Sequence, residues 1–215
     1  RQGLYSAVAA KHVGPAGRVI SIEPAPENCR ILESTLRLND FRQVTVVRKA
    51  VTDESGEGSL YLCEDNKGDH RIFSLDRQRK RLPIEVSTLD AILRDCAVSK
   101  VDVLKVDIQG SEARALKGMT QTLTANEHIR VIMELWPWGI AQAGGDANEA
   151  LASIRDLGFE IFELDGDKRS VRRITTNAEL VLRRLERHRV NLLLQRSGAP
   201  SVQPNRASPH NSVHA

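Results

Sequence analysis

Hydrophobic and polar positions near the start of the chain alternate between a helical and an extended period. Apolar residues recur at helical spacing until a Gly-Pro pair interrupts them, and a short run rich in β-branched residues follows. The predicted elements are a helix over residues 4–13, a strand over 17–24, a helix over 25–40 and a strand over 43–51. This alternation predicts parallel strands joined by right-handed crossovers.

The middle of the chain departs from this rhythm and the second half returns to it. Residues 57–65 alternate as an exposed strand would, and a polar loop follows over residues 65–81. Further on the pattern predicts a strand and a helix over 82–95, with Ser87 or Thr88 as the N-cap of the helix. A strand over 100–110, a helix over 111–118 and a strand over 128–135 follow. The last predicted elements are a helix over 144–158 capped by Asp146, a strand over 159–165, a helix over 176–188 and a strand over 189–196. The chain is therefore predicted to be an α/β protein.

Composition supports a single globular domain. The 215 residues are 40% hydrophobic and 27% charged, and no apolar run is long enough to cross a membrane. We expect one domain over residues 1–196 and a disordered tail over residues 197–215, which lack periodicity and are rich in Ser, Pro and Asn. No export signal is visible, and the three dispersed cysteines suggest a reducing compartment, so a cytoplasmic location is expected. Their spacing predicts no metal site.

The net charge of +3 is too small to indicate a nucleic-acid partner. Much of the excess positive charge lies in two basic segments, residues 76–86 and 167–174, which we interpret as solvated loops. The less favoured alternative is a surface for an acidic or phosphate-bearing substrate.

A glycine and an acid stand at the spacing used in dinucleotide-type folds. Gly3 precedes the first predicted helix, and Glu23 follows the first predicted strand, twenty positions later. In such folds the glycine lets the backbone approach the ligand, and the acid accepts hydrogen bonds from ribose hydroxyls. A lone Glu before a proline is usually a surface residue, but the helix and strand between the two favour a binding role here.

A second group of candidates follows the strand in "LKVDIQGSE". Asp107 falls at the carboxyl end of a predicted parallel strand, where open α/β sheets bind ligands. Glu112 lies in the first turn of the next helix, where the dipole favours a carboxylate, so a helix-start role and a substrate role are weighed equally. We expect Lys105 to point away from Asp107, which leaves a functional role as the better explanation of that acid.

Two further segments carry candidate substrate residues. The loop sequence "EDNKGDHRIFS" holds His70, which can titrate near neutral pH, and Arg71, which can bind a carboxylate or phosphate with two parallel bonds. The segment "MELWPWG" places Glu134, Trp136 and Trp138 at the same expected edge of the sheet, as a substrate wall or as a plug for the end of the sheet.

These residues together resemble the FkbM-type family of S-adenosylmethionine-dependent methyltransferases. The matching pieces are "GLYS", "GRVISIEPAPENCRILESTLRLND", "KAVTDESGEGSLYL", "STLDAIL", "VDVLKVDIQGSEARALKGM" and "RVIMEL", and the resemblance extends from Gly3 to about Arg196. It implies a Rossmann-like methyltransferase sheet of seven strands, mostly parallel, with an antiparallel last strand. It also implies S-adenosylmethionine as cofactor and methylation of a hydroxyl on a sugar or secondary metabolite.

The resemblance assigns roles to single residues. It implies a cofactor site at Gly3, Tyr5, Glu23, Pro24, Ala50, Val51 and Asp107, with Glu23 on the ribose and Ala50 and Val51 beside the adenine. Asp107 and Glu112 would lie by the transferred methyl group as catalytic residues, and His70, Arg71 and Trp136 would contact the acceptor. Asp107 or His70 could accept the hydroxyl proton, and position favours Asp107.

One departure from the family concerns the first strand. That strand and most of the glycine loop would precede Arg1, so we expect the sheet to lack its first strand in this chain. An alternative function is a catalytically inert Rossmann-like binding module without the cofactor loop. A nicotinamide-dependent dehydrogenase would also suit Gly3 and Glu23, but not "KVDIQGSE". The sequence leaves the acceptor's identity and the oligomeric state open.

Overall fold

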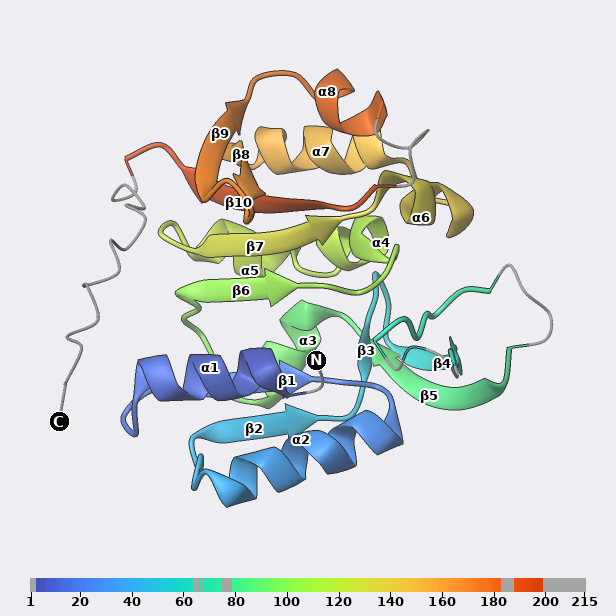
Figure 1. The fold of residues 1–215 in the computed structure, drawn as a ribbon, viewed down its shortest axis with the longest axis vertical. Coiled ribbons are helices and arrows are strands. Elements are labelled where there is room, and N and C mark those ends of the chain that lie inside the picture. The colour runs from blue at the N-terminus through green and yellow to red at the C-terminus, as the bar shows by residue number, and fades with distance from the viewer. Residues whose placement is uncertain (1–2, 64–65, 67, 75–78, 183–187, 199–215) are drawn as a thin grey trace, which may run out of the picture.

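The computed structural model describes residues 3–63, 66, 68–74, 79–182 and 188–198. Its first sheet joins β1 (Val19–Ile22) and β2 (Val44–Val47) in parallel, with Ile20 opposite Thr45. α1 (Leu4–Val13) and α2 (Pro26–Leu38) lie alongside these two strands (Figure 1). The predicted order of helix and strand in this part is confirmed.

The second sheet contains five strands in the order β6-β7-β10-β8-β9. They are β6 (Val103–Val106), β7 (Arg130–Leu135), β8 (Phe159–Asp165), β9 (Ser170–Ile174) and β10 (Val190–Arg196). β6 and β7 are parallel, whereas β10 runs antiparallel to both of its neighbours, β7 and β8. The α/β class and the antiparallel last strand are therefore confirmed.

The main hydrophobic core lies between this sheet and its helices. Val131, Met133 and Leu135 alternate along β7 and are fully buried, because every second residue of a strand points to the same face. α4 (Glu112–Lys117), α5 (Thr120–Ala125) and α7 (Ala147–Asp156) supply further buried apolar side chains to the same core. Asp146 caps α7 by accepting hydrogen bonds from two backbone N–H groups, as its position predicts.

A third, three-stranded sheet stands beside the others (Figure 1). It joins β3 (Ala50–Val51), β5 (Arg81–Ser87) and β4 (Gly56–Tyr61), with β5 in the middle. α3 (Leu89–Asp95) follows it, and the Thr88 hydroxyl accepts the hydrogen bond that caps this helix. Two short helices complete the described chain, α6 (Pro137–Gln142) and α8 (Ala178–Val181).

β1 and β6 each have one open edge among the strands that the structure describes. β1 pairs with β2 alone, and β6 pairs with β7 alone. β6 is the strand of the five-stranded sheet nearest to β1 in Figure 1. The single expected sheet is thus divided at the place where the family's first strand is expected. Among the described residues no strand lies between β1 and β6, which agrees with the expectation that the sheet lacks its first strand in this chain.

Two details of the predicted elements are wrong. The strand predicted over residues 43–51 is two strands in different sheets, because β3 leaves β2 and pairs with β5. The basic segment 167–174, predicted to be a loop, contains β9. Its arginines pair across the hairpin with acids of β8, Arg172 with Glu163 and Arg173 with Glu160. Such cross-strand pairs stabilise a strand that is largely exposed on both faces.

Other predictions concern residues outside the described part of the chain. The helix predicted over residues 176–188 is described only as the short α8, and residues 183–187 lie outside the description. The expected tail is described for residues 197 and 198 alone, so its disorder and the domain boundary at residue 196 stay predictions. α5 and α6 were not predicted.

Candidate active site at the carboxyl ends of the parallel strands

Two acids meet where β6 and β7 end. The strands are parallel, with Val106 opposite Met133, so Asp107 and Glu134 come next to each other in the same register. Gln109 connects them, because its Nε2 donates to Asp107 Oδ1 over 2.7 Å and lies 3.4 Å from Glu134 Oε2. Burial raises the pKa of Glu134, and the charge of Asp107 raises it further. The sequence-predicted position of Asp107 is thus the meeting point of several polar groups.

Lys105 is a partner of Asp107, contrary to our expectation. Its Nζ lies 3.6 Å from Asp107 Oδ2, because residues two apart on an extended chain point to the same side. Lys105 Nζ also lies 5.2 Å from the centroid of the Tyr5 ring. The start of α1 is therefore close to the carboxylate of Asp107.

Glu112 is a buried acid at the first residue of α4, with 1% of its surface exposed. Its Oε1 accepts a hydrogen bond from the Gly110 N–H at 3.0 Å. Burial raises the pKa of Glu112 to about 7, and the nearby charges of Glu134 and Asp107 act in the same direction. A carboxyl group that titrates near neutral pH can exchange a proton under physiological conditions.

Three buried acceptor atoms follow one another along the turn after β6. Within the part of the chain that the structure describes, Gln109 Oε1, Ser111 Oγ and Glu112 Oε2 have no hydrogen-bond partner. The sequence predicted Ser111 near the helix start, but its side chain makes no capping bond. Buried polar atoms without partners are rare. The three oxygens of this turn can therefore accept hydrogen bonds from a bound ligand.

Close packing shapes this turn. Gln109 has a φ of 54° and Gly110 a φ of 99°, both in the left-handed region. A Cβ added at Gly110 would lie 2.8 Å from the carbonyl carbon of Gly139 and 2.9 Å from Cε1 of Phe73. Gly110 thereby allows α6 and the polar loop to approach the ends of the strands. Strained backbone of this kind often accompanies functional sites.

Glu23 lies directly after β1, at the expected edge of the first sheet. Its N–H donates to the Val47 carbonyl, and its Oε1 accepts from the Ala25 N–H at 2.9 Å. Burial raises the pKa of Glu23, whereas the hydrogen bonds from Ala25 and Asn28 lower it. Pro24 is half-buried beside it and turns the chain into α2.

The other proposed cofactor residues lie on α1 and in the third sheet. Gly3, at the start of α1, has a φ of 79°, and a Cβ added there would lie 3.3 Å from Leu32 Cδ1 on α2. Tyr5 is half-exposed on α1. Ala50 and Val51 belong to the third sheet, three and four residues beyond the strand end at Val47. Among the described residues, no side-chain hydrogen bond or ion pair joins either of them to Glu23 or Asp107.

The polar loop brings Arg71 to Trp136 but directs His70 elsewhere. Arg71 Cζ lies 4.7 Å from the centroid of the Trp136 ring, a cation–π contact. Trp136 itself is 5% exposed, which supports packing more than an open substrate wall. His70 Nδ1 accepts a hydrogen bond from the Cys63 N–H at 3.0 Å, so this nitrogen supports the loop.

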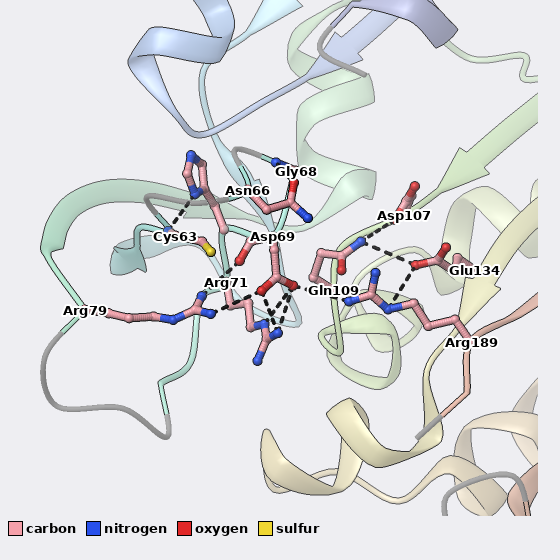
Figure 2. Close-up of polar contacts among 11 residues, drawn as sticks. Cys63, Asn66, Gly68, Asp69, Arg71, Arg79, Asp107, Gln109, Glu134 and Arg189 are labelled. Atoms are coloured by element: carbon pink, nitrogen blue, oxygen red, sulfur yellow. Dashed lines mark hydrogen bonds and ion pairs between the residues drawn. The ribbon is translucent and has the colours of Figure 1, made fainter. Parts of the chain in front are cut away.

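Sequence reasoning missed Asp69, Arg79 and Arg189. Figure 2 shows Arg71, Arg79 and Arg189 around Asp69, with Gln109 and Glu134 beside Arg189. One signal could have found Arg189. The last strand is antiparallel and begins where its neighbours end, with Val190 opposite Leu135, so the preceding residue comes beside Trp136.

Two other features are absent from the residues that the structure describes. No group of three or more His, Cys, Asp or Glu side chains there is arranged to hold a metal ion. No helix in the same residues has the length and apolar character needed to cross a membrane.

Comparisons with known proteins give two sequence matches. Residues 2–161 match the family described as the methyltransferase FkbM domain. Methyltransferase sdnD from Sordaria araneosa is 25% identical over 193 residues, covering 74% of this chain and 70% of that protein.

A solved structure shows a similar fold. Methyltransferase FkbM from Methylobacillus flagellatus KT has a TM-score of 0.51 and 18% identity, covering 90% of this chain and 41% of that one. The chain thus spans less than half the length of that solved protein. Precorrin-6y C5,15-methyltransferase from Geobacter metallireducens GS-15 has a TM-score of 0.46 and 10% identity, covering 91% of this chain and 76% of that one.

Proposed function

Because the chain belongs to the FkbM methyltransferase family, we propose that it transfers a methyl group from S-adenosylmethionine to a hydroxyl of a sugar or a secondary metabolite. The observation that carries this proposal is the grouping of Asp107 and Glu134 at the ends of adjacent parallel strands, with Glu112 at the start of the helix that follows. The family match favours this function over a dehydrogenase, and nothing in the matches favours an inert binding module.

The chain offers residues that fit the proposed cofactor. Glu23 is half-buried at a strand end, where the Ala25 N–H and the Asn28 side chain both hydrogen-bond its carboxylate, and the remaining lone pairs of that carboxylate suit a ribose hydroxyl. Gly3 has the left-handed backbone that a close approach of the chain to a ligand requires. We propose that the cofactor is held by Gly3, Tyr5, Glu23, Pro24, Ala50, Val51 and Asp107.

S-adenosylmethionine supplies a methyl group on a sulfonium, which is already a good leaving group. The protein must therefore align the acceptor oxygen and remove its proton as the new O–CH₃ bond forms and the S–CH₃ bond breaks. We propose that Asp107 accepts this proton, since Lys105 and Gln109 hold both of its oxygens in place. Glu112 then orients the acceptor through its second oxygen.

The other parts of the proposal concern partners and location. We propose a small-molecule or carbohydrate acceptor, with no nucleic-acid or membrane partner, and a cytoplasmic location. The modest net charge of +3 supports this view of the partners.

The test is methyl transfer from radiolabelled S-adenosylmethionine to a panel of sugars and hydroxylated metabolites. Asp107→Asn keeps an oxygen for Gln109 but removes the base, so we expect the rate to fall by roughly 10²-fold or more. Asp102→Asn is the matched control, because Asp102 is an exposed acid before the same strand that pairs with Lys100. An unchanged rate in Asp107→Asn would remove Asp107 from the chemistry.

A further inference from the structure

Three arginine side chains converge on the buried carboxylate of Asp69 (Figure 2). Arg71 Nη2 donates to both oxygens, at 2.8 and 2.7 Å. Arg79 Nη2 donates to Oδ2 at 3.1 Å, and Arg189 Nη2 donates to Oδ1 at 3.3 Å. Arg71 and Arg79 come from the polar loop, whereas Arg189 directly precedes β10.

Among the described residues, the positive charges of this cluster exceed its negative charges. Besides Asp69, the acid that contacts these arginines within the described residues is Glu134, whose Oε2 lies 3.7 Å from Arg189 Nε. Three guanidinium groups therefore face two carboxylates. Each guanidinium carries five N–H donors in a fixed fork. The three groups together therefore offer more donors than two carboxylates can accept in this arrangement.

Trp136 keeps two of the arginines beside each other. The Cζ atoms of Arg71 and Arg189 both lie 4.7 Å from the centroid of its ring. Both cations are thus held by the indole as well as by Asp69, so they need little further ordering to bind an anion.

The arginine cluster adjoins the buried acceptors of the turn after β6. Glu134 Oε2 contacts Arg189 on one side and Gln109 Nε2 on the other. Gln109 Oε1, Ser111 Oγ and Glu112 Oε2 then follow, which among the described residues have no hydrogen-bond partner. A ligand that spans both groups would need an anionic group at one end and hydroxyl donors at the other.

We propose that Arg71, Arg79 and Arg189 form a subsite for an oxyanion of the methyl acceptor, which is a hydroxylated small molecule carrying a carboxylate or a phosphate. The inference rests on the proposed function, because it names the substrate class of the same site. Asp69 keeps the three guanidiniums together before the acceptor binds. The acceptor's hydroxyls donate to the buried acceptors beside Glu112.

The test compares the binding of three probes that share a sugar ring. Dissociation constants of glucuronate, glucose 1-phosphate and glucose are measured by ligand-observed NMR, with and without S-adenosylhomocysteine. We expect at least one anionic probe to bind about tenfold or more tightly than glucose, because hydrogen bonds between charged groups are the strong ones. The probe that binds more tightly identifies the oxyanion as carboxylate or phosphate.

Variants locate the binding site. Arg189→Gln should weaken the anionic probe by about tenfold and leave glucose unchanged. Arg79→Gln is the second variant, should Arg189→Gln fail to fold as judged by its melting curve. Arg42→Gln is the control, since Arg42 is exposed and pairs with Asp40 far from the cluster. Equal binding of all three probes, or anion binding that neither cluster variant changes, would overturn the subsite and leave the arginines as a purely structural clamp.

The outcomes also separate this inference from the proposed function. Calorimetry of S-adenosylhomocysteine with the unmodified protein reports on the cofactor site alone. Cofactor binding without arginine-dependent anion binding would contradict the anion subsite and leave the proposed function standing. Arginine-dependent anion binding without cofactor binding would support the subsite and contradict the methyltransferase proposal.

Discussion

Arg189 Nη2 lies 3.3 Å from Asp69 Oδ1, although 120 residues separate the two in the sequence. The contact joins the polar loop, which precedes β5, to the residue that directly precedes β10. The position of the loop over the strand ends therefore depends on the residue that directly precedes the last strand. Two elements that are distant in the sequence together build the proposed acceptor site.

Removing the carboxylate of Asp69 should destabilise the fold. In Asp69→Asn three guanidiniums lose their shared anion, and we expect the free energy of unfolding to fall by about 2 to 3 kcal/mol in urea titrations. Asp40→Asn is the control, because it breaks only the exposed pair with Arg42 and should cost less than about 1 kcal/mol. Equal losses in the two variants would contradict the view that the cluster anchors the loop.

The same cluster predicts an acid-dependent loss of stability. Burial acts to raise the pKa of Asp69, but hydrogen bonds from Arg71 and Arg79 outweigh it, so the pKa falls below its ordinary 3.8. The contribution of Asp69 to stability is therefore present above pH 3.8 and is lost as the pH falls through the lowered pKa. Unfolding curves of Asp69→Asn should lack this acid-dependent step.

Glu112 should make the protein less stable as the pH rises towards neutrality. Its pKa is about 7 in the folded state and 4.5 as an isolated group, so folding favours the protonated form. The free energy of unfolding should fall by roughly 3 kcal/mol between these two pH values on account of this group. Glu112→Gln keeps an oxygen for the Gly110 N–H and should lack that decline. Parallel pH profiles for the two proteins would show that Glu112 is already ionised in the folded state.

Gly110→Ala should destabilise the protein more than Gly144→Ala. Both glycines have a left-handed φ, 99° and 81°, so alanine is strained at either position. Only at Gly110 would the new Cβ meet the backbone of Gly139, since nothing lies within 4 Å of it at Gly144. We expect a loss of roughly 1 kcal/mol at Gly144 and about 3 kcal/mol or more at Gly110, measured by thermal unfolding. Equal losses would mean that the close contact relaxes without cost.

The open edges of β1 and β6 should be visible in amide hydrogen exchange. β7 is paired on both sides, with β6 and β10, whereas β1 and β6 each have one described partner strand. Amides that point to the open edges should exchange much faster than those of β7, because they lack a ladder partner. Protection of β1 and β6 equal to that of β7 would show that another segment covers these edges.

Local signals in the sequence predicted much of the fold. Asp146 and Thr88 were placed as helix caps because each precedes a helical apolar pattern, and both side chains make the capping bond. The strand ends at Glu23 and Asp107 followed from apolar runs that end in an acid. β9 was missed because its stability comes from pairing with acids of β8, which no local pattern reveals.

The candidate site was predictable only where one segment carries it. Asp107 and Glu112 share a single motif, and the structure places both in the turn after β6. The partners Asp69 and Arg189 depend on how the loop and the antiparallel β10 come together, which is set by tertiary register. The pairing of Lys105 with Asp107 was within reach of local reasoning, because residues two apart on a strand share a face.

The most direct measurement of the central claim is calorimetric titration of the protein with S-adenosylhomocysteine, carried out in parallel on Glu23→Ala and Glu33→Gln. Glu33 is a control acid on α2 that pairs with Arg48. We expect the unmodified protein and Glu33→Gln to bind equally well, and Glu23→Ala to bind about 1 to 3 kcal/mol more weakly through loss of the ribose hydrogen bonds. Absence of binding to the unmodified protein, or equal binding in all three proteins, would contradict the account.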